Sequence, residues 1–353
     1  MSNITYAIGA PKPGAPLETM AIERRGLGPD DVAIDIAYVG LCHSDIHTVR
    51  GEWGDAQFPM VPGHEITGVV AAIGPEVTRH QVGDRVAVGY MVDSCGVCRH
   101  CLAGTEQFCL RGHVTTYNGL GYDGRPTHGG YSRRIVVRDR FVCRVPDGLA
   151  LDVAAPLLCA GITTYAPLRR WGVEPGTRVA VVGLGGLGHM AVKLAVAMGA
   201  DVSVLSRTTA KMADALWLGA HEFHATCAPS VFDGLRGRFE LVLLTVPARL
   251  PLDPYLETLR VGGVLVLVGL PGEPLSFDPF SLVDNNAVVA GSLVGGIAET
   301  QQLLDFCAEH RVGAEIETIS ADQINAAYAR VLDGEVRYRF VMDASTIGDE
   351  RLT

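Results

Sequence analysis

The sequence predicts an α/β protein of two domains, one rich in β-strands and one built on a doubly wound parallel sheet. Three observations support this prediction. The chain has 353 residues, more than a single domain usually contains. Hydrophobic residues make up 48% and charged residues 19%, a composition that can bury a large core. Short strand-like segments fill the first part of the chain, whereas strands alternate with helices in its middle.

The first domain is predicted from short apolar or alternating segments separated by Gly, Pro and Asp. VAIDIAYVG, ITGVVAAIG, RVAVGY and YSRRIVVR have the pattern of a small barrel or sandwich. After about Gly296 the chain offers two helical segments and a last strand, YRFVMD. We interpret this tail as returning to the first domain, which then comprises residues 1–155 and 296–353.

The second domain is predicted from strand and helix patterns that alternate. RVAVVGLGGLGHMAVKLAVAMGA predicts a strand, a glycine turn and a helix, DVSVLSR another strand, and AKMADALWLGA another helix. FELVLLTV and GGVLVLVGL continue the strand series. Residues 156–295 are therefore expected to form the doubly wound parallel sheet.

The overall charge and the start of the chain narrow the classes of partner. The net charge is −10, from 29 basic and 39 acidic residues, and no run of Lys and Arg offers a nucleic-acid surface. MSNITYAIGA does not resemble a secretory signal, and the apolar run Val264–Leu270 has only the length of a strand. We expect a cytoplasmic protein with no nucleic-acid or membrane partner. In that compartment clustered cysteines favour metal binding over disulfides.

Four of the nine cysteines lie close together in DSCGVCRHCLAGTEQFC. Two gaps of two residues and one of seven allow four thiolates to converge on one ion, and zinc favours four sulfur ligands in a closed, structural site. Disulfides, unpaired buried cysteines and a DNA-reading zinc finger are the alternatives, although no Arg-rich recognition helix follows. The predicted structural-zinc ligands are Cys95, Cys98, Cys101 and Cys109.

Three more candidate ligands are spread along the chain: Cys42 in GLCHSD, His64 in PGHE and Cys159 in LLCAGIT. Each is ordinary when taken singly, because a lone buried cysteine usually acts as a small hydrophobe. Together, two thiolates and an imidazole with an open fourth position would form a catalytic zinc site.

A glycine-rich turn predicts the nucleotide site. GLGGLG follows the strand VAVV and opens a helix, the context that places a pyrophosphate on a helix N-terminus. The next strand ends in SRTTAK, which contains no acidic residue to accept hydrogen bonds from the ribose hydroxyls of NAD. Its hydroxyl groups and two cations suit the 2′-phosphate of NADP instead. We therefore expect NADP(H) rather than NAD(H). An exposed basic turn without a role is the alternative. The residues concerned are Gly183, Leu184, Gly185, Gly186, Leu187, Gly188, Ser206, Arg207 and Lys211.

The order of these motifs resembles a known family. GLCHSD, GHE, the four-cysteine loop, THGGYS, PLLCAGITTY and GLGGLGHMAVK occur in this order in zinc-dependent medium-chain alcohol dehydrogenases. The chain is most similar to the cinnamyl-alcohol dehydrogenase-like branch, which includes bacterial aldehyde reductases, and the similarity extends to GGIAETQQLLDF and YRFVMD. The resemblance implies a GroES-like β-rich catalytic domain and a Rossmann-type nucleotide domain.

The resemblance also implies a role for each residue around the second zinc. Cys42, His64 and Cys159 would be the catalytic zinc ligands. Glu65 would be a conditional ligand able to replace the zinc-bound water, and Asp45 would orient the ligating imidazole.

A proton relay is implied in the same way. Ser44 would take the substrate hydroxyl proton and pass it through the cofactor ribose to His47, which releases it to water. For His47 the alternative is an ordinary surface histidine. His43 would face the cofactor pyrophosphate. Further cofactor contacts implied by the resemblance are Thr163, Thr245, Gly269, Ser292, Leu293 and Val294.

The substrate pocket is expected to be apolar and to suit aromatic or medium-chain aldehydes. Val114 aligns with a tryptophan of the plant enzymes that reduce lignin precursors, which argues against a role specific to those substrates. For Trp53, ordinary packing is an equal alternative. The expected wall residues are Trp53, Phe58, Met91, Val114, Leu293 and Val294.

These features predict a zinc-dependent oxidoreductase that interconverts primary alcohols and aldehydes with NADP(H). Aldehyde reduction is the expected direction, because cytosolic NADPH is kept reduced. A polyol or secondary-alcohol dehydrogenase of the same superfamily is the alternative enzyme. A non-catalytic binder of zinc and dinucleotide is the alternative from another class, but the chain retains every ligand together with Ser44 and His47. The resemblance implies a homodimer joined at sheet edges near GSLVGG.

Overall fold

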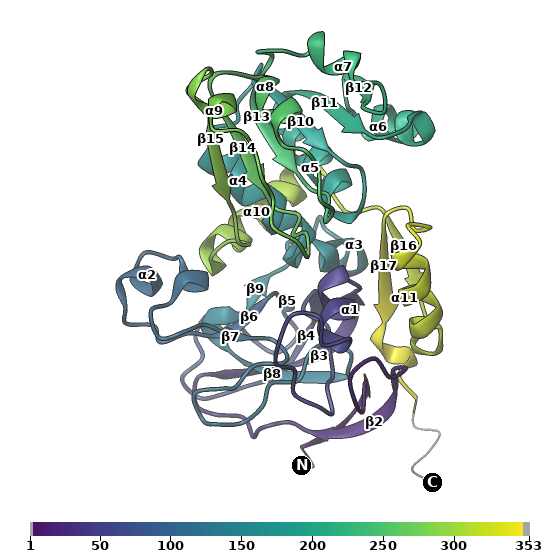
Figure 1. Cartoon of the computed structure of the whole chain (residues 1–353). Coiled ribbons are helices and arrows are strands. Elements are labelled where there is room, and N and C mark those ends of the chain that lie inside the picture. The colour runs from purple at the N-terminus through teal and green to yellow at the C-terminus, as the bar shows by residue number, and fades with distance from the viewer. Residues whose placement is uncertain (1–2, 349–353) are drawn as a thin grey trace. The chain divides into compact units, whose positions relative to one another are not determined.

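The structure, a computed structural model that describes residues 3–348, consists of two compact units (Figure 1). One unit contains the chain up to Cys159 and the chain from Gly295 onward; the other runs from Ala160 to Val294. The first is rich in β-strands and the second contains a parallel sheet, which confirms the predicted α/β class with two domains. The sequence places the junctions at residues 155 and 296, whereas here Cys159 belongs to the β-rich unit.

The β-rich unit is organised around β3 (Asp31–Gly40), which pairs antiparallel with β4 (Ile66–Ile73), β8 (Arg134–Arg138) and β17 (Arg339–Asp343). Its main sheet has the order β16-β17-β3-β4-β5-β9, with β8 also paired to β3. The other elements are β1 (Ile4–Gly9), β2 (Glu18–Glu23), β5 (Arg85–Val88), β6 (Met91–Asp93), β7 (Val114–Thr115), β9 (Cys143–Arg144), β16 (Ile316–Ile319), α1 (His43–Val49), α2 (Arg99–Leu102), α3 (Leu151–Ala154), α10 (Ile297–His310) and α11 (Ile324–Leu332), with the 3₁₀ turns η1 (Glu106–Phe108), η2 (Asp139–Phe141), η3 (Ala155–Leu158), η5 (Ala321–Gln323) and η6 (Ala344–Thr346).

The C-terminal segment is part of this unit's core. Phe340 and Met342 of β17 are fully buried and pack in the same cluster as Ile34 and Val39 of β3. Burying these apolar side chains stabilises the return of the chain, because each buried side chain of this size contributes about 1.5–3 kcal/mol. The last helices and strand of the tail therefore help to form the domain that the N-terminal strands begin.

The dinucleotide unit contains a six-stranded sheet of order β12-β11-β10-β13-β14-β15, in which every neighbouring pair is parallel. The central strands read as continuous apolar runs because both of their faces are buried. The elements are α4 (Ala160–Arg170), β10 (Arg178–Val182), α5 (Gly186–Ala197), β11 (Asp201–Ser206), η4 (Thr209–Lys211), α6 (Met212–Trp217), β12 (Glu222–Ala225), α7 (Ser230–Asp233), β13 (Phe239–Leu244), α8 (Asp253–Glu257), β14 (Leu259–Leu267), α9 (Phe280–Val283) and β15 (Val288–Gly291).

Among residues 3–348, no single helix is both long and apolar enough to cross a membrane. Two helical segments joined at a bend, Leu151–Leu158 and Ala160–Arg170, are long and apolar enough only when they are taken together. Most of their residues are buried in the protein.

Candidate active site

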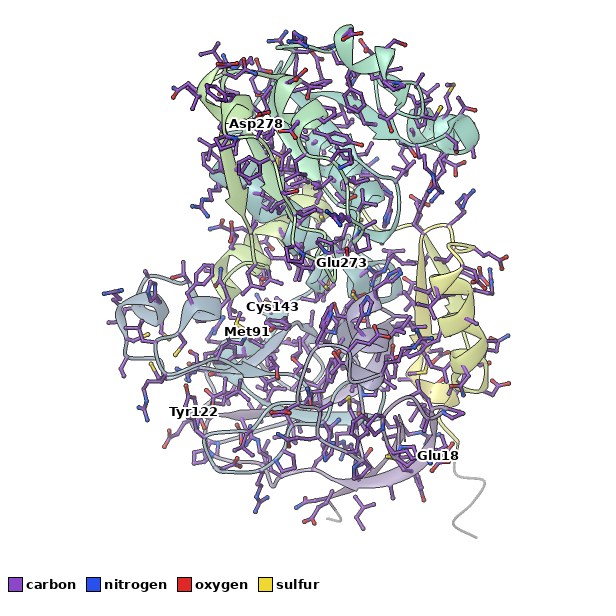
Figure 2. All side chains as sticks on the ribbon, viewed as in Figure 1. Glu18, Met91, Tyr122, Cys143, Glu273 and Asp278 are labelled. Atoms are coloured by element: carbon purple, nitrogen blue, oxygen red, sulfur yellow. The ribbon has the colours of Figure 1, made fainter. Side chains whose placement is uncertain are left out.

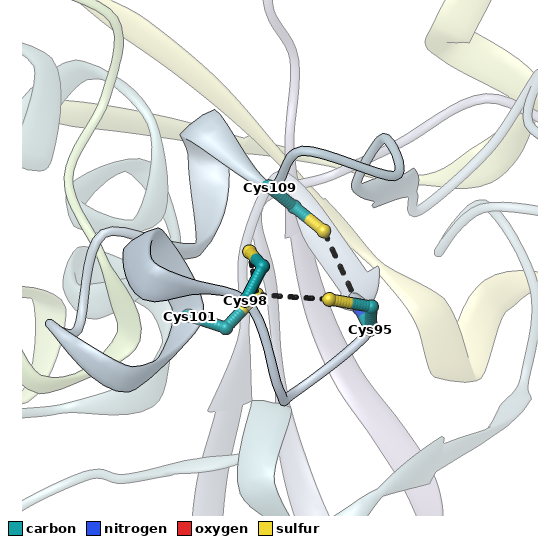
Figure 3. A group of neighbouring side chains, drawn as sticks. All are labelled: Cys95, Cys98, Cys101 and Cys109. Atoms are coloured by element: carbon teal, nitrogen blue, oxygen red, sulfur yellow. Dashed lines mark hydrogen bonds between the residues drawn. The ribbon is translucent and has the colours of Figure 1, made fainter.

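The four cysteines of the loop between β6 and β7 converge, with all four Sγ atoms within 4.8 Å of one another (Figure 3). The sulfurs of Cys95 and Cys101 are 3.8 Å apart and those of Cys98 and Cys101 are 3.5 Å apart. Four sulfurs bound at ~2.3 Å to one tetrahedral zinc would be separated by about 3.8 Å, so the cluster fits this ion. None of these four cysteines is joined in a disulfide.

Local backbone and neighbouring side chains hold this loop in place. The N–H of Cys95 donates to the Sγ of Cys109 at 3.4 Å, and backbone hydrogen bonds from Cys101 and Leu110 lower the pKa of the Cys98 thiol to about 6. Glu106 accepts a hydrogen bond from the N–H of Ile297 at 3.2 Å, so the loop also holds the first turn of α10. The loop thus combines a thiol at Cys98 that ionises readily with a support for the C-terminal segment.

A second cluster forms where β3, β4 and η3 end or begin. Cys42 caps α1 directly after β3, His64 precedes β4, and Cys159 follows η3. One ligand atom from each of these residues and from Glu65 lies within 4.8 Å of the others, and the two sulfurs are 3.9 Å apart. A hydrogen bond from the Cys159 thiol lowers the pKa of the Cys42 thiol well below its usual range. Two sulfurs, an imidazole and a carboxylate are a donor set that suits zinc.

Asp45 holds the imidazole of this cluster. Its Oδ1 accepts hydrogen bonds from His64 Nδ1 and from the N–H of Gly63, both at 3.1 Å, and its Oδ2 accepts from the N–H of Cys42 at 3.0 Å. Asp45 is fully buried and His64 is 2% exposed. Because Nδ1 carries the donated proton, Nε2 retains the lone pair that a metal needs.

Only one of the two carboxylate oxygens of Glu65 has a hydrogen-bond partner in the described part of the chain. Arg339 of β17 donates from Nη2 to Glu65 Oε1 and also to the carbonyl of Leu41 at 2.7 Å. The other oxygen, Oε2, has no hydrogen-bond partner among the described residues, although it is buried. Burial raises the pKa of Glu65 to about 7. An unpartnered carboxylate oxygen beside two thiols and an imidazole is consistent with the expected conditional ligand.

A cavity of about 210 Å³ lies beside His64 within the β-rich unit. Ser44 lies next to the cluster, with its Oγ 3.5 Å from Cys42 Sγ. One turn further along α1, the ring of His47 stacks on Trp53 with centroids 5.0 Å apart, and its Nδ1 pairs with Glu52. The lining residues are Ser44, Thr48, Trp53, Gly54, Ala56, His64, Tyr90, Thr115, Thr116, Tyr117 and Asn118.

Several expected wall residues do not line this cavity. Met91, which is labelled in Figure 2, and Val114 are buried in the β-rich unit, with 2% and 5% exposure. Phe58 packs against the core. Their neighbours Tyr90 and Thr115 line the cavity instead. The reason is the alternation of side chains along β6 and β7, where a shift of one residue exchanges the two faces. Of the expected wall, only Trp53 lines this cavity; Leu293 and Val294 belong to the dinucleotide unit.

In the dinucleotide unit, the glycine-rich turn has the geometry of a phosphate site. Gly183 has φ +90°, a side chain on Gly188 would lie 2.2 Å from the Gly183 carbonyl oxygen, and α5 begins at Gly186. Thr245 Oγ1 donates to the carbonyl of Val182 at 2.8 Å and so braces the turn. Free backbone N–H groups at such a helix start bind anionic phosphates.

The remaining expected cofactor residues are also in this unit, except His43 and Ser44 on α1. Ser206 ends β11, Arg207 is exposed just beyond it, and Lys211 donates from Nζ to the carbonyl of Leu184 at 2.7 Å. Gly269 leaves no room for a side chain, which would meet the Val246 carbonyl at 2.6 Å. Thr163 lies in α4, and Ser292, Leu293 and Val294 follow β15.

Sequence reasoning missed Arg339 and the tyrosines around Asp45. Arg339 is 6% exposed and begins the strand RFVMD, so a charge directly before the apolar residues Phe340 to Met342 was the available signal. Tyr131 and Tyr328 gave no comparable signal, since buried tyrosines are common in cores.

Comparisons with known proteins agree with this architecture. Residues 28–147 match the family described as alcohol dehydrogenase GroES-like domain, and residues 186–309 match the family described as zinc-binding dehydrogenase. The chain is 58% identical to a probable formaldehyde dehydrogenase, AdhA, of Bacillus subtilis (strain 168), over 94% of this chain and 95% of that protein. It is 56% identical to NADP-dependent alcohol dehydrogenase C 1 of Mycolicibacterium smegmatis, over 98% of this chain and 99% of that protein.

A solved structure is similar throughout its length. The cinnamyl alcohol dehydrogenase of Helicobacter pylori complexed with NADP(H) matches with a TM-score of 0.92 and 40% identity, covering 98% of this chain and 99% of that one. The fold, the two side-chain clusters that could each hold a metal ion, and the relatives together define an oxidoreductase. The chain belongs to the zinc-binding alcohol dehydrogenase family, with relatives in its cinnamyl-alcohol dehydrogenase branch, which confirms the resemblance found in the motifs.

Proposed function

We propose that this protein interconverts primary alcohols and aldehydes with NADP(H), working mainly as a reductase of aromatic or medium-chain aldehydes. The observation that carries the proposal is the buried cluster of Cys42, His64 and Cys159 beside a cavity that also contains Ser44. Bound there, zinc would supply a Lewis acid that polarises an oxygen of the substrate, and NADPH would supply the hydride.

The residues of the chain divide the remaining tasks. Cys42, His64 and Cys159 would hold the ion, with Asp45 fixing the ring of His64. Ser44 would donate the proton that the aldehyde oxygen needs as it becomes an alcohol, since Ser44 lines the same cavity. His47, whose side chain is 27% exposed, would exchange protons with water.

The cavity wall supports an aromatic or apolar substrate. The hydroxyls of its three threonines are already used inside the protein: Thr48 donates to the carbonyl of Ser44 at 2.7 Å, Thr115 to that of Tyr117 at 2.8 Å, and Thr116 to that of Gly89. These side chains therefore offer methyl groups to a ligand, and Trp53 and Tyr117 offer rings. A substrate rich in hydroxyl groups, such as a sugar alcohol, would find few free partners.

NADP(H) selectivity would depend on Ser206, Arg207 and Lys211. The stretch contains no carboxylate to accept from the ribose of NAD, and the exposed guanidinium of Arg207 suits a phosphate. The NADP-dependent relative and the neighbour complexed with NADP(H) support this preference.

Location and assembly complete the proposal. A cytoplasmic location suits two metal sites made of thiolates, which need a reducing compartment. A homodimer would join at the free edge of β15, the last strand of the parallel sheet, where Val288, Phe280 and Val283 are 40%, 70% and 71% exposed. Light scattering of the purified protein tests this: a dimer mass is expected, and a monomer mass would contradict it.

A substrate and cofactor panel tests the function. Benzaldehyde and cinnamaldehyde should be reduced with NADPH far faster than with NADH, and Arg207→Ala should narrow that preference by about tenfold or more. Comparable rates with the two cofactors would contradict the assignment. Higher kcat/KM for ketones or sugar alcohols than for aldehydes would favour a secondary-alcohol or polyol dehydrogenase instead.

A further inference from the structure

Two tyrosine hydroxyls continue the hydrogen-bond network of Asp45 away from the metal cluster. Tyr131 donates from its hydroxyl to Asp45 Oδ2 at 3.4 Å, and Tyr328 donates to the hydroxyl of Tyr131 at 3.4 Å. Tyr131 is fully buried, and Tyr328 is partly buried against the same core. A buried tyrosine hydroxyl needs a partner, and these are the partners that the described residues provide.

Asp45 is a buried carboxylate that depends on such donors. It receives hydrogen bonds from the N–H groups of Cys42 and Gly63 and from His64 Nδ1, and its fourth donor is Tyr131. In the described chain no lysine or arginine pairs with it, so two backbone N–H groups, the His64 ring and a tyrosine hydroxyl are its hydrogen-bond partners. In a low-dielectric interior each of these hydrogen bonds counts strongly toward where the carboxylate sits.

The two tyrosines come from distant parts of the chain. Tyr131 follows Gly129 and Gly130, and Gly130 donates its N–H to the carbonyl of Gly63, directly before His64. Tyr328 belongs to α11, in the segment that returns to this unit after the dinucleotide unit. Burial raises the pKa of both tyrosines well above the usual value, so both hydroxyls remain protonated donors at working pH.

We propose that Tyr328 and Tyr131 form a hydrogen-bonded relay from α11 to Asp45 that positions His64 and thereby sets how firmly the Cys42–His64–Cys159 cluster retains its metal. Both are positioning residues, because they act through Asp45. The inference rests on the proposed metal site at that cluster. Under this proposal the C-terminal segment does more than pack in the core, because its helix α11 contributes to metal retention.

The test measures zinc release from the purified, zinc-loaded protein to a chelating dye. The four-cysteine loop serves as an internal reference in every sample. Tyr131→Phe should speed release from the Cys42–His64–Cys159 cluster by about tenfold, the lower end for partners that orient a ligand. Tyr328→Phe should speed it by about two- to threefold, because it lies one step further away. Tyr255→Phe removes a buried hydroxyl from the dinucleotide unit and should leave both release rates unchanged.

The double variant distinguishes a relay from general loosening. If Tyr328 acts through Tyr131, the double variant should release zinc at the rate of Tyr131→Phe, without the further two- to threefold acceleration that Tyr328→Phe shows alone. Independent, multiplying effects would overturn the relay, as would equal acceleration at both metal sites or rates like those of Tyr255→Phe. If Tyr131→Phe does not fold, Tyr328→Phe decides: faster release from that cluster supports the relay, and an unchanged rate overturns it. Wild-type protein that holds only one zinc would instead refute the proposed function.

Discussion

The two cysteine clusters of the β-rich unit offer similar atoms to a metal but are assembled in opposite ways. The loop cluster draws its four sulfurs from residues 95–109, and its supports are mostly backbone N–H groups of the same loop. The other cluster joins Cys42 to Cys159, 117 positions apart, and depends on buried charged groups. Asp45 and Glu65 are fully buried beside it, and Arg339 is 6% exposed.

This difference indicates a difference in task. A closed set of four thiolates leaves no coordination position for a substrate, so the loop cluster can stabilise but not catalyse. The second cluster has two thiolates and an imidazole beside a cavity. The carboxylate of Glu65, which lies next to them, is hydrogen-bonded to Arg339. Loss of a ligand should therefore abolish activity at one cluster and lower stability at the other.

The largest expected effect comes from His64→Ala. Loss of a metal ligand at the cavity should lower kcat/KM for benzaldehyde by at least about 10³-fold, since a Lewis acid contributes several kcal/mol to the transition state. Metal content should fall from two to one per chain. Cys98→Ser is the matched control: it should also hold one metal, yet keep turnover within about tenfold at low temperature. Equal losses of activity in the two variants would contradict the assignment of one cluster to catalysis and the other to stability.

Next in size is the stability cost of Cys98→Ser. Without its metal the loop should lose on the order of 3 kcal/mol of folding free energy, which corresponds to about 6–12 °C in Tm. Limited proteolysis should then cut between residues 95 and 113, as protection of the loop is lost. An unchanged Tm together with a resistant loop would show that the metal has no structural task.

A smaller effect is expected from Asp45→Asn. The amide keeps the shape of the side chain but accepts poorly from His64 Nδ1, so zinc affinity at the Cys42–His64–Cys159 cluster should fall by about 10- to 100-fold. Competition with a calibrated chelator measures this. Asp35→Asn, an exposed carboxylate paired with Arg134 on β8, is the control and should change nothing. Similar losses in both variants would argue against the orienting role.

The smallest predicted effect is that of Glu106→Ala. Removing the carboxylate that accepts a hydrogen bond from the N–H of Ile297 should lower the free energy of unfolding by about 1 kcal/mol. The carboxylate gives this N–H a partner, and its negative charge is favourable at the N-terminus of α10. Hydrogen exchange should quicken in the first turn of α10. Glu309→Ala, near the other end of the same helix, should leave that turn unaffected. An unchanged exchange rate would mean that the loop does not support α10.

The same contrast explains what the sequence could predict. The loop cluster follows from spacing along fifteen consecutive positions, and the glycine turn from a strand before it and a helix after it. The family resemblance was needed to predict one metal site from Cys42, His64 and Cys159, because their convergence depends on how three distant segments fold. The strands β12 and β15 went unpredicted, since they are four residues long and partly exposed, without alternation or a long apolar run.

The partners of the site were the hardest to predict. Arg339 reaches Glu65 across 274 positions, and Tyr328 meets Tyr131 across 197. Neither contact leaves a local pattern. Met91 and Val114 were expected in the pocket wall, whereas their neighbours Tyr90 and Thr115 line the cavity beside His64.

Metal removal and restoration tests the central claim most directly. The purified protein should contain two zincs per chain; a chelator that strips the Cys42–His64–Cys159 cluster first should abolish NADPH-dependent benzaldehyde reduction when one zinc is lost. Adding one equivalent of zinc should restore the rate. Turnover that persists after that zinc is gone, or that depends only on the metal of the four-cysteine loop, would contradict the account.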